Sequence, residues 1–536
     1  MRDFHLPGRS PVYSTHGMAA TAMPAATLTA LDVLRAGGNA MDAAVAATAV
    51  LGVIEPQSTG IGGDCFCLYA PGGTDRIVAL NGSGRAPAAA TIDWFEARGI
   101  DTLENTSPHT VTIPGAISAW DKLLAAHGTM GLDQVLQPAI RFAEEGWPVG
   151  ARVASDWAKL EDKLRRNGAD AFLPQGAAPR AGDMFVQKPL AETLRTIAKH
   201  GPAGFYQGAV AADMVAALQA HGGLQTEADF AAGQDVAEFV DPIRIDYRGH
   251  TVWQCPPNGS GLHVLMLLGI LEGFDPAPGG PLDPLRLHRH IEAARLVYRD
   301  RDAFLADPSQ VEVPVAHLTS PNYLAGLRAL IRDGRAMERM PAAGEAQENT
   351  SLPAHKDTTY LCVVDRDGNA CSFINSLFQG FGSGILAPNT GVMLQNRGFG
   401  FRIQRGHPNC IAPNKRPMHT IIPGMVTKGG RARMPYGVMG GHFQPMGQSW
   451  FLSNMMDYGL DIQEALDLPR IFPTGGKVEA ERGIPAPALD ALRAMGHQVT
   501  GVDRPHGGGQ AIWIADTPRV LVGGSEPRKD GLALGY

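Results

Sequence analysis

The sequence predicts a layered protein of the α/β or α+β class with a large hydrophobic core. Hydrophobic residues make up 44% of the 536-residue chain and charged residues only 18%, which suffices for a sizeable core. The 65 glycines and 40 prolines follow no collagen-like period and form no low-complexity segment, so they indicate many tight turns. Helical patterns dominate before residue 335, and strand-like patterns dominate after residue 357.

The first part of the chain reads as helices interrupted by two pairs of strands. A helix with partial 3.6-residue periodicity is expected over 27–36, followed by an almost entirely apolar, and therefore buried, helix over 41–53. Two short apolar runs, 65–69 and 76–80, flank a Pro-Gly-Gly sequence and predict a strand–turn–strand unit. A second strand pair is expected around 243–253, and further helices over 114–130, 132–145, 152–166, 190–200, 209–221, 263–271 and 285–305.

A break in the pattern divides the chain into two regions. Residues 335–357 have no apolar periodicity and include two prolines, which predicts a flexible linker at the end of a large region, 1–357. The small region, 358–536, opens with strands over 359–364 and 370–377 around an Asp-Gly turn. Further strands are expected over 421–427, 511–514 and 520–522, and helices over 448–458 and 486–495.

Composition excludes some classes of protein. The 46 basic and 53 acidic side chains give a net charge of −7, and without a long Lys/Arg run the chain is not expected to bind nucleic acid. The N-terminus lacks the apolar core of a signal peptide, and the most apolar stretch, 40–54, is too short to span a bilayer. We therefore expect a soluble, cytoplasmic protein without a membrane partner.

Six cysteines form no C-x-x-C pair and are expected to be buried free thiols: Cys65, Cys67, Cys255, Cys362, Cys371 and Cys410.

The boundary between the two regions carries a candidate nucleophile. Thr358 follows the predicted linker, which ends at Asp357, and directly precedes a strand. If the Thr358 hydroxyl attacked the Asp357 carbonyl, an ester would form, and its hydrolysis would leave Thr358 with a free α-amine. That amine, with a pKa of ~7.7–8.0 in model peptides, could serve as the general base for its own hydroxyl. Thr-Thr at the start of a strand is also ordinary β-propensity, so a purely structural interpretation stays open.

Paired glycines form a second candidate feature. Gly440 and Gly441 lie where a strand-like segment leads into a helix. Backbone N–H groups at such glycines can approach a substrate and point at a developing oxyanion. A tight strand-to-helix turn without catalytic function is the alternative.

Neither a cofactor nor a metal is expected. The glycine-rich run 59–63 lacks the Lys-Ser/Thr of a phosphate-binding loop and the spacing of a dinucleotide-binding loop. His288 and His290 are two residues apart, so they face different sides of a predicted helix. No H-E-x-x-H pattern occurs in the sequence.

A set of short motifs follows a recognisable order along nearly the whole chain. The motifs are HGMAA (16–20), GGNAMDAA (37–44), EPQSTGIGG (55–63), PPNGSG (256–261), TT (358–359), VVDRDGNA (363–370), FGSGI (381–385), PNKRP (413–417), GG (440–441) and SEPRKDG (525–531). In this order and spacing they resemble the γ-glutamyltranspeptidase family of N-terminal nucleophile (Ntn) hydrolases.

The resemblance implies a fold and a maturation pathway. The fold would be a four-layer αββα sandwich of the Ntn-hydrolase type. A precursor would be cut before Thr358 into a large chain, 1–357, and a small chain, 358–536, which stay associated; a dimer of this heterodimer is left open. Gly440 and Gly441 match the oxyanion-hole glycines of the family. Ser376 matches a threonine whose hydroxyl supports the nucleophile, and it keeps the hydroxyl without the methyl group.

Positions that bind the γ-glutamyl group in that family differ in this chain. An acidic residue that holds the α-amine is lost, and a new arginine appears near it. In this chain, Gly400 stands where the family has the acidic residue, Arg397 where it has a glutamine, and Phe378 where it has an asparagine. His419 and Thr420 replace a pair of serines. Ser83 replaces an arginine, and Arg85 follows two residues later.

These differences predict a substrate with a carboxylate and without an α-amine. An ammonium without its partner in a partly desolvated pocket would cost several kcal/mol, whereas an arginine can grip a carboxylate with two parallel hydrogen bonds. Arg85, Arg397, His419 and Thr420 are therefore the candidate substrate-binding residues, with structural ion pairs as the alternative for the two arginines.

We therefore expect a self-processing threonine amidohydrolase that hydrolyses a small amide through an acyl-enzyme. It resembles the oxamate amidohydrolase-like and cephalosporin (glutaryl) acylase-like branches of the family. One alternative is a γ-glutamyltransferase or glutathione hydrolase. Another is an unprocessed, catalytically silent binding protein.

Overall fold

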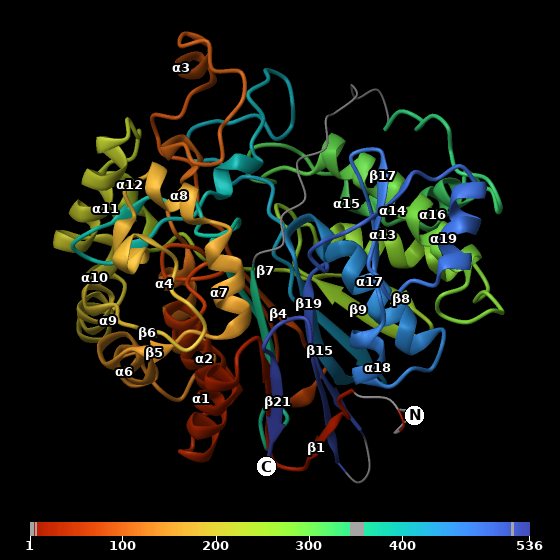
Figure 1. Cartoon of the computed structure of the whole chain (residues 1–536), viewed down its shortest axis with the longest axis horizontal. Coiled ribbons are helices and arrows are strands. Elements are labelled where there is room, and N and C mark those ends of the chain that lie inside the picture. The colour runs from red at the N-terminus through yellow and green to blue at the C-terminus, as the bar shows by residue number, and fades with distance from the viewer. Residues whose placement is uncertain (1–4, 6–7, 344–357, 516–518) are drawn as a thin grey trace.

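Two seven-stranded antiparallel sheets form the centre of the protein (Figure 1). A computed structural model describes residues 5, 8–343, 358–515 and 519–536. The first sheet has the order β21 (Leu532–Gly535), β2 (Met18–Thr21), β10 (Thr359–Val364), β11 (Ala370–Ser376), β3 (Asp64–Ala70), β4 (Val78–Gly82) and β7 (Glu238–Val240). The second has the order β1 (Val12–Ser14), β20 (Leu521–Ser525), β19 (Gly508–Ile514), β15 (Arg431–Met439), β14 (Gly424–Lys428), β9 (His250–Gln254) and β8 (Ile243–Tyr247).

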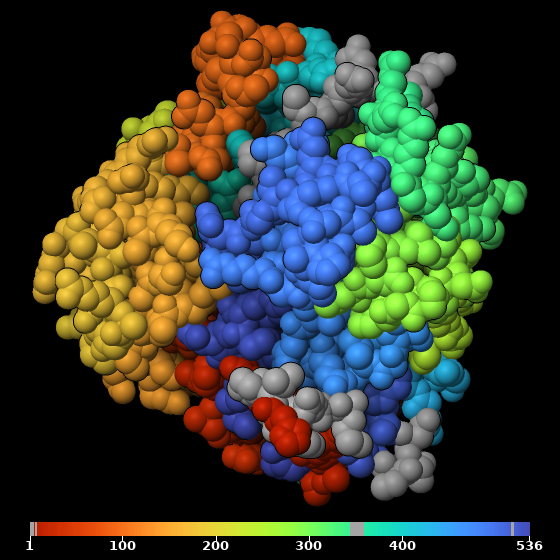
Figure 2. Space-filling model, turned by 45° about the vertical axis from the view of Figure 1, so that its right-hand side comes forward, coloured from red at the N-terminus to blue at the C-terminus, as the bar shows by residue number. Residues whose placement is uncertain are grey.

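Each sheet combines strands from both sides of the predicted linker. In the first sheet, β10 and β11 lie between β2 and β3, which come from the large region. In the second sheet, β9 pairs with β14, and β1 pairs with β20. Figure 2 shows the result at the surface, where red N-terminal and dark blue C-terminal segments lie against one another at the bottom. Backbone hydrogen bonds would therefore hold the two regions together after a cut between them.

Helices cover the outer face of each sheet. On one side, α1 (Pro24–Arg35), α2 (Ala40–Ile54) and α4 (Ala116–His127) pack on the first sheet. On the other side, α13 (Gly261–Glu272), α17 (Gln444–Met456) and α18 (Ile462–Asp467) pack on the second sheet. The two sheets pack on each other, with β10 against β15 and β19. The resulting order of layers, visible from left to right in Figure 1, confirms the predicted αββα sandwich.

The apolar runs in the sequence reflect burial on both faces. Every residue of α2 is buried, as is every residue of β10 and β11, because a layer lies on each side of them. α2 begins at a capping box, in which the Asn39 side chain accepts from the backbone N–H of Asp42 and the Asp42 carboxylate accepts from that of Asn39. This cap fixes the start of the helix beneath the central strands.

The remaining elements surround this sandwich. The helices are α3 (Ile92–Glu96), α5 (Leu132–Val135), α6 (Gln137–Glu145), α7 (Ala151–Ala158), α8 (Glu161–Arg166), α9 (Lys188–His200), α10 (Ala203–Tyr206), α11 (Gly208–Ala220), α12 (Glu227–Gly233), α14 (Pro284–Phe304), α15 (Val315–Leu318), α16 (Pro321–Ala329) and α19 (Ala486–Ala494). The short strands are β5 (Trp147–Pro148), β6 (Met184–Phe185), β12 (Leu386–Ala387), β13 (Val392–Met393), β16 (Ile471–Thr474), β17 (Lys477–Ala480) and β18 (Val499–Gly501).

Some predicted boundaries were wrong. The helix expected over 132–145 is divided into α5 and α6, because Pro138 in the first turn of α6 has no N–H to continue the preceding helix. The helix expected over 152–166 is divided into α7 and α8 at Lys159 and Leu160. The strand expected from residue 421 begins only at Gly424, after Pro423.

Part of the predicted linker lies in the described structure. Residues 335–343 contain no helix or strand of their own, but the Ala336 N–H donates to the Met495 carbonyl at 2.7 Å. Met337 and Met340 pack against the core next to α14. Residues 344–357, including Asp357, lie outside the described residues.

The structure agrees with the prediction that the cysteines are buried free thiols, except that Cys410 is only partly buried. All six are free thiols, five of them buried and Cys410 half-buried. No helix in the described part of the chain is both long enough and apolar enough to cross a bilayer.

A buried carboxylate near the C-terminus makes a strong contribution to stability. Glu526 is completely buried, and Arg470 and Arg528 both donate to it. Burial alone would raise the pKa of Glu526, but the two guanidinium charges outweigh burial and hold the pKa at about 2. Because this value lies below the ordinary 4.5, the pairing stabilises the fold fully above pH 4.5 and loses its effect as the pH falls toward 2.

We expect Glu526→Gln to lower the free energy of unfolding by about 3 kcal/mol at pH 7, because it leaves the buried Arg470 without its carboxylate and removes one of the two carboxylates that pair with Arg528. Denaturant unfolding at several pH values measures this, and the difference in unfolding free energy between wild type and variant should narrow as the pH falls from 4.5 toward 2. Glu338→Gln, at an exposed ion pair with Arg335, is the control and should change stability by less than about 1 kcal/mol. A difference in unfolding free energy between wild type and Glu526→Gln that does not change with pH would contradict this role of Glu526.

Candidate active site

Thr358 lies at the entrance to the central strand β10. Its side chain is fully buried, and its Oγ1 is 3.1 Å from the Oγ of Ser376, the last residue of β11. The register explains this contact, because Thr359 pairs with Asn375 and Thr358 therefore lies across from Ser376. The structure thus brings the predicted nucleophile and the predicted supporting hydroxyl together.

The Ser376 hydroxyl is oriented by the chain that follows it. Its oxygen accepts a hydrogen bond from the Phe378 backbone N–H at 2.8 Å. This bond leaves the Ser376 proton and one lone pair, so either hydroxyl can donate in the contact with Thr358, and Ser376 is able to serve as the donor. Such a donor would stabilise negative charge on the nucleophile during attack.

The next residue anchors the start of β10. The Thr359 hydroxyl donates to Glu55 Oε2 at 2.6 Å, and Lys529 Nζ lies 3.9 Å from Glu55 Oε1. Burial raises the pKa of Glu55, and the Lys529 charge and the Thr359 hydrogen bond oppose this. Sequence analysis did not assign Glu55 a role, although it opens one of the motifs that carried the resemblance. Its contact fixes the strand that presents Thr358.

Gly440 and Gly441 form the turn between β15 and α17. Their φ angles are 120° and 55°, which non-glycine residues rarely adopt. A Cβ on Gly440 would also lie only 2.9 Å from the Cα of Gly507. The turn is close to Phe378, because the ring of the following residue, His442, lies 6.3 Å from the Phe378 ring.

Arg397 is a fully buried cation next to this site. It opens a short 3-10 turn, and its Nη1 donates to Thr420 Oγ1 at 2.8 Å. Its guanidinium carbon lies 4.1 Å from the centre of the Phe378 ring. Burial lowers the pKa of Arg397 to about 9, against the opposing charge of Asp64, so the side chain stays charged at neutral pH. Nε and Nη2 have no hydrogen-bond partner among the described residues.

Asp64 is the first residue of β3, the strand next to the one that carries Ser376. It lies opposite Ser376 in the pairing of β3 with β11. The carboxylate oxygens accept hydrogen bonds from Gly84 N (3.0 Å), Gly115 N (3.1 Å), Gln395 Nε2 (2.9 Å) and His419 Nε2 (2.9 Å). These donors satisfy Asp64 without an ion pair to Arg397. Sequence analysis missed Asp64 as a site residue; the only signal was its position directly after the EPQSTGIGG motif.

The neutral ring of His419 donates a hydrogen bond to Asp64. Burial, and after it the charge of Arg397, lowers the pKa of His419 to about 3. The neutral ring donates from Nε2 to Asp64, and Nδ1 accepts from the Ile421 N–H at 3.4 Å. Both ring nitrogens therefore have protein partners. His419 as a direct substrate anchor stays a prediction, and its contacts favour a positioning role.

Arg85 lies in a different set of contacts. Its Nη1 is 3.3 Å from Asp307 Oδ2 and donates to the Asn414 carbonyl at 2.9 Å. The side chain is 28% exposed. These contacts favour the structural ion pair that the sequence left open for this residue.

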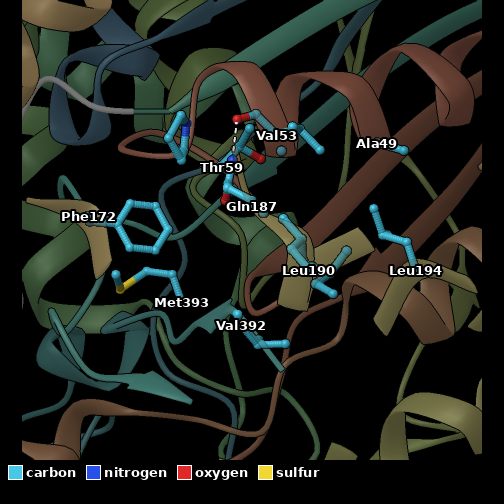
Figure 3. A pocket seen from close by; sticks show the side chains of 14 residues that line it. Ala49, Val53, Thr59, Phe172, Gln187, Leu190, Leu194, Val392 and Met393 are labelled. Atoms are coloured by element: carbon cyan, nitrogen blue, oxygen red, sulfur yellow. Dashed lines mark hydrogen bonds between the residues drawn. The ribbon is translucent and has the colours of Figure 1, made fainter. Parts of the chain in front are cut away.

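The cavity in Figure 3 is not a substrate site. It lies behind the segment that follows α2, has a volume of about 20 Å³ and is lined mainly by apolar side chains such as Val53, Leu190 and Met393. The dashed line marks the hydrogen bond from Gln187 Nε2 to the Val53 carbonyl. This volume holds about one water molecule. In the described part of the chain no cluster of His, Cys, Asp and Glu could hold a metal ion.

The contact between Thr358 and Ser376 gives a testable expectation. We expect Ser376→Ala to lower kcat by about 10–100-fold, because it removes a hydrogen bond to the nucleophile and leaves the buried Phe378 N–H without its acceptor. Amide hydrolysis by the purified protein measures this. Ser376→Thr keeps the hydroxyl and should retain most of the activity. An unchanged kcat in Ser376→Ala would show that this hydroxyl does not support the nucleophile.

Comparison with known proteins gives consistent matches over most of the chain. The family model described as Gamma-glutamyltranspeptidase matches residues 26–536. The chain is 37% identical over 515 residues to the glutathione hydrolase-like YwrD proenzyme of Bacillus subtilis, covering 94% of this chain and 95% of that protein. It is 34% identical over 539 residues to the oxamate amidohydrolase proenzyme of Klebsiella pneumoniae, covering 98% of this chain and 99% of that protein.

A solved structure matches the whole fold. The crystal structure of a cephalosporin acylase from Bacillus halodurans superposes with a TM-score of 0.92, covering 100% of this chain and 99% of that chain at 39% identity. This agreement extends to both sheets and both helical layers.

Proposed function

Because the chain belongs to the γ-glutamyltranspeptidase family, whose members act on C–N amide bonds, we propose that it is a self-processing threonine amidohydrolase for small amides with a carboxylate on the acyl group. The reaction needs no metal or cofactor, since the nucleophile, the base and the oxyanion donors all come from the chain.

The observation that carries this proposal is the buried, partly unpaired guanidinium of Arg397. A buried charge without hydrogen-bond partners is costly, so a group with two free N–H positions indicates a ligand that completes them. A carboxylate fits, because its oxygens accept from two nitrogens of one guanidinium at once. Phe378 and Thr420 hold the guanidinium in place, and the Phe378 N–H donates to Ser376, which contacts Thr358.

The position of Thr358 at the start of β10 supports self-cleavage as the maturation step. Its Oγ attacks the carbonyl carbon of residue 357, and the acyl group moves from nitrogen to oxygen. Water hydrolyses the ester, which leaves a carboxylate on Asp357 and a free α-amine on Thr358. The strands from both regions keep the large and small chains associated after the cut.

Turnover uses the same groups on a substrate. The α-amine takes the proton of the Thr358 hydroxyl while Oγ attacks the amide carbonyl, and it then gives this proton to the leaving nitrogen. Backbone N–H groups of Gly440 and Gly441 stabilise the oxyanion, with about 3 kcal/mol for each donor. Water, activated by the same amine, releases the acyl group as a free acid.

A glutathione hydrolase activity is the second candidate. Similarity to the glutathione hydrolase-like protein of Bacillus subtilis favours it. Binding of a γ-glutamyl group, however, would place an ammonium beside the charged Arg397, and Gly400 supplies no acidic partner for it. Like charges in a partly desolvated site disfavour this substrate.

A substrate panel distinguishes these two functions. Purified, processed protein would be assayed with oxamate, glutaryl amides and γ-glutamyl amides, with release of ammonia or amine as the signal. We expect the amides with a carboxylate and no α-amine to be hydrolysed faster. Faster hydrolysis of the γ-glutamyl amides would overturn the proposed substrate class.

A further inference from the structure

Two glutamines of α17 hold the backbone of Ile422. The Ile422 N–H donates to Gln444 Oε1 at 3.2 Å, and Gln448 Nε2 donates to the Ile422 carbonyl at 2.6 Å. The two glutamines are four residues apart in α17, so they lie on one face of the helix. Both side chains are fully buried. This glutamine pair, Gln444 and Gln448, thus satisfies both backbone hydrogen-bonding groups of one residue.

The sequence explains why residue 422 needs these partners. Pro423 follows it, and strand β14 begins only at Gly424. Ile422 therefore lies just outside the sheet, yet it is fully buried. A buried backbone group without a partner is costly. The glutamine pair supplies at this position the hydrogen bonds that a neighbouring strand supplies inside a sheet.

Gln448 is itself fixed in position. Its Oε1 accepts a hydrogen bond from Gln254 Nε2 at 2.7 Å. Gln254 is the last residue of β9, and it pairs with Gly424 in β14. The Gln448 amide therefore has a partner on each side, which fixes its orientation. Residue 422 is held in this way by α17 and by the second sheet together.

The glutamine pair connects the two parts of the proposed site that would bind one substrate. At one end, Gln444 begins α17 three residues after Gly441, in the turn proposed to stabilise the oxyanion. At the other end, Ile422 lies two residues after Thr420, whose hydroxyl accepts from Arg397 Nη1 at 2.8 Å. The pair thus joins the oxyanion turn to the segment that holds the guanidinium.

A substrate that uses both parts at once is sensitive to the distance between them. Its scissile carbonyl would lie at the oxyanion turn, and its acyl carboxylate would lie at Arg397. The number of carbons between these two groups must then match that distance. One methylene group too many or too few commonly changes kcat/KM by ~10–200-fold.

We propose that the glutamine pair determines which acyl chain length the enzyme hydrolyses fastest. The inference rests on the proposed function and adds specificity-determining positions to it. Both glutamines act through Ile422 and are therefore positioning residues. With the pair intact, Arg397 stays at one distance from the oxyanion turn, and one chain length fits best. Without it, residues 420–422 can shift, and several chain lengths fit with similar, lower efficiency.

The test compares three amides that share one amine and differ in acyl length. Succinyl, glutaryl and adipyl p-nitroanilides all release p-nitroaniline, which is measured by its absorbance. With the wild type, we expect kcat/KM for one of them to exceed the next by about tenfold or more. Gln448→Met keeps the length of the side chain but removes the donor to the Ile422 carbonyl. This variant should lower that ratio to about threefold or less.

A glutamine in α18 provides a matched control. Gln463 Nε2 donates to the Ser525 carbonyl at 2.9 Å, and the Ser525 N–H donates to Gln463 Oε1 at 3.0 Å. Ser525 belongs to β20, which is separated from β14 by β19 and β15. Gln463→Met therefore removes the same kind of backbone contact at another place, and it should keep the wild-type ratio.

The outcomes separate this inference from the proposed function. An unchanged ratio in Gln448→Met, or the same fall in Gln463→Met, would overturn the role of the glutamine pair. Equal rates of the wild type on the three amides would also overturn it, and the amidohydrolase would stand in all these cases. Hydrolysis of none of the three amides by the wild type would overturn the proposed substrate class and this inference with it.

Maturation of the variants is checked separately. Two bands on a denaturing gel show for each variant that it has folded and been cut. Gln444→Met removes the acceptor of the Ile422 N–H and is the second variant, which should lower the same ratio. Failure of both Gln444→Met and Gln448→Met to mature would show that the pair is needed for the fold and would overturn its proposed role in chain-length preference.

Discussion

Thr358→Ala is expected to remain a single chain of 56.8 kDa and to lose amide hydrolysis by roughly 10⁴-fold or more. Without the hydroxyl, no ester forms at residue 357, so the chain is not cut. Without the cut, there is neither a nucleophile nor a free α-amine. A denaturing gel shows the first effect, and an amide hydrolysis assay shows the second.

Thr358→Ser is the matched control. It keeps the hydroxyl beside Ser376 and should give two bands and measurable activity. A wild type that runs as one band and hydrolyses no amide would support a silent binding protein instead. Wild-type hydrolysis rates in Thr358→Ala would contradict the assignment of the nucleophile.

Replacement of Arg397 should remove the preference for a carboxylate on the acyl group. We expect Arg397→Met to lower kcat/KM for the preferred amide by about 100-fold or more, because a desolvated carboxylate would lose its charged partner. The ratio of kcat/KM for a glutaryl amide to that for the uncharged butyryl amide reports this directly. That ratio should fall with the variant.

Stability gives an independent check on Arg397. The guanidinium is fully buried with two nitrogens unpartnered, so an apolar side chain of similar size should leave the free energy of unfolding unchanged or raise it. Arg397→Lys keeps a charge without the two-pronged geometry and should recover only part of the activity. A destabilised Arg397→Met with unchanged substrate preference would show a structural role instead.

The sequence predicted the centre of the fold well because burial there leaves a clear pattern. The strand expected over 359–364 is β10 itself, and the helix expected over 41–53 is α2 with one more residue at each end. Both lie between two layers, so their apolar runs are continuous. The edge strands β1 and β21 were not predicted, because they are short and pair with segments far away in the chain.

The candidate site was predicted in part. Thr358 and Ser376 were placed together by the family resemblance, and the strand register explains their contact. The role of Asp64 was missed, because its hydrogen-bond donors come from segments scattered over more than 300 positions of the sequence. Periodicity and motif spacing carry no information on such contacts. The same reasoning explains why Arg85, two residues after the position that matches a substrate-binding arginine of the family, has its contacts elsewhere.

The most direct test compares the cleaved fraction of the protein with its active fraction. Mass spectrometry of the purified enzyme identifies the N-terminal residue of the small chain, and titration with a slowly hydrolysed amide counts active sites. We predict a small chain that begins with Thr358 and an active fraction equal to the cleaved fraction. Full activity in protein whose peptide bond between Asp357 and Thr358 is unbroken would contradict the account.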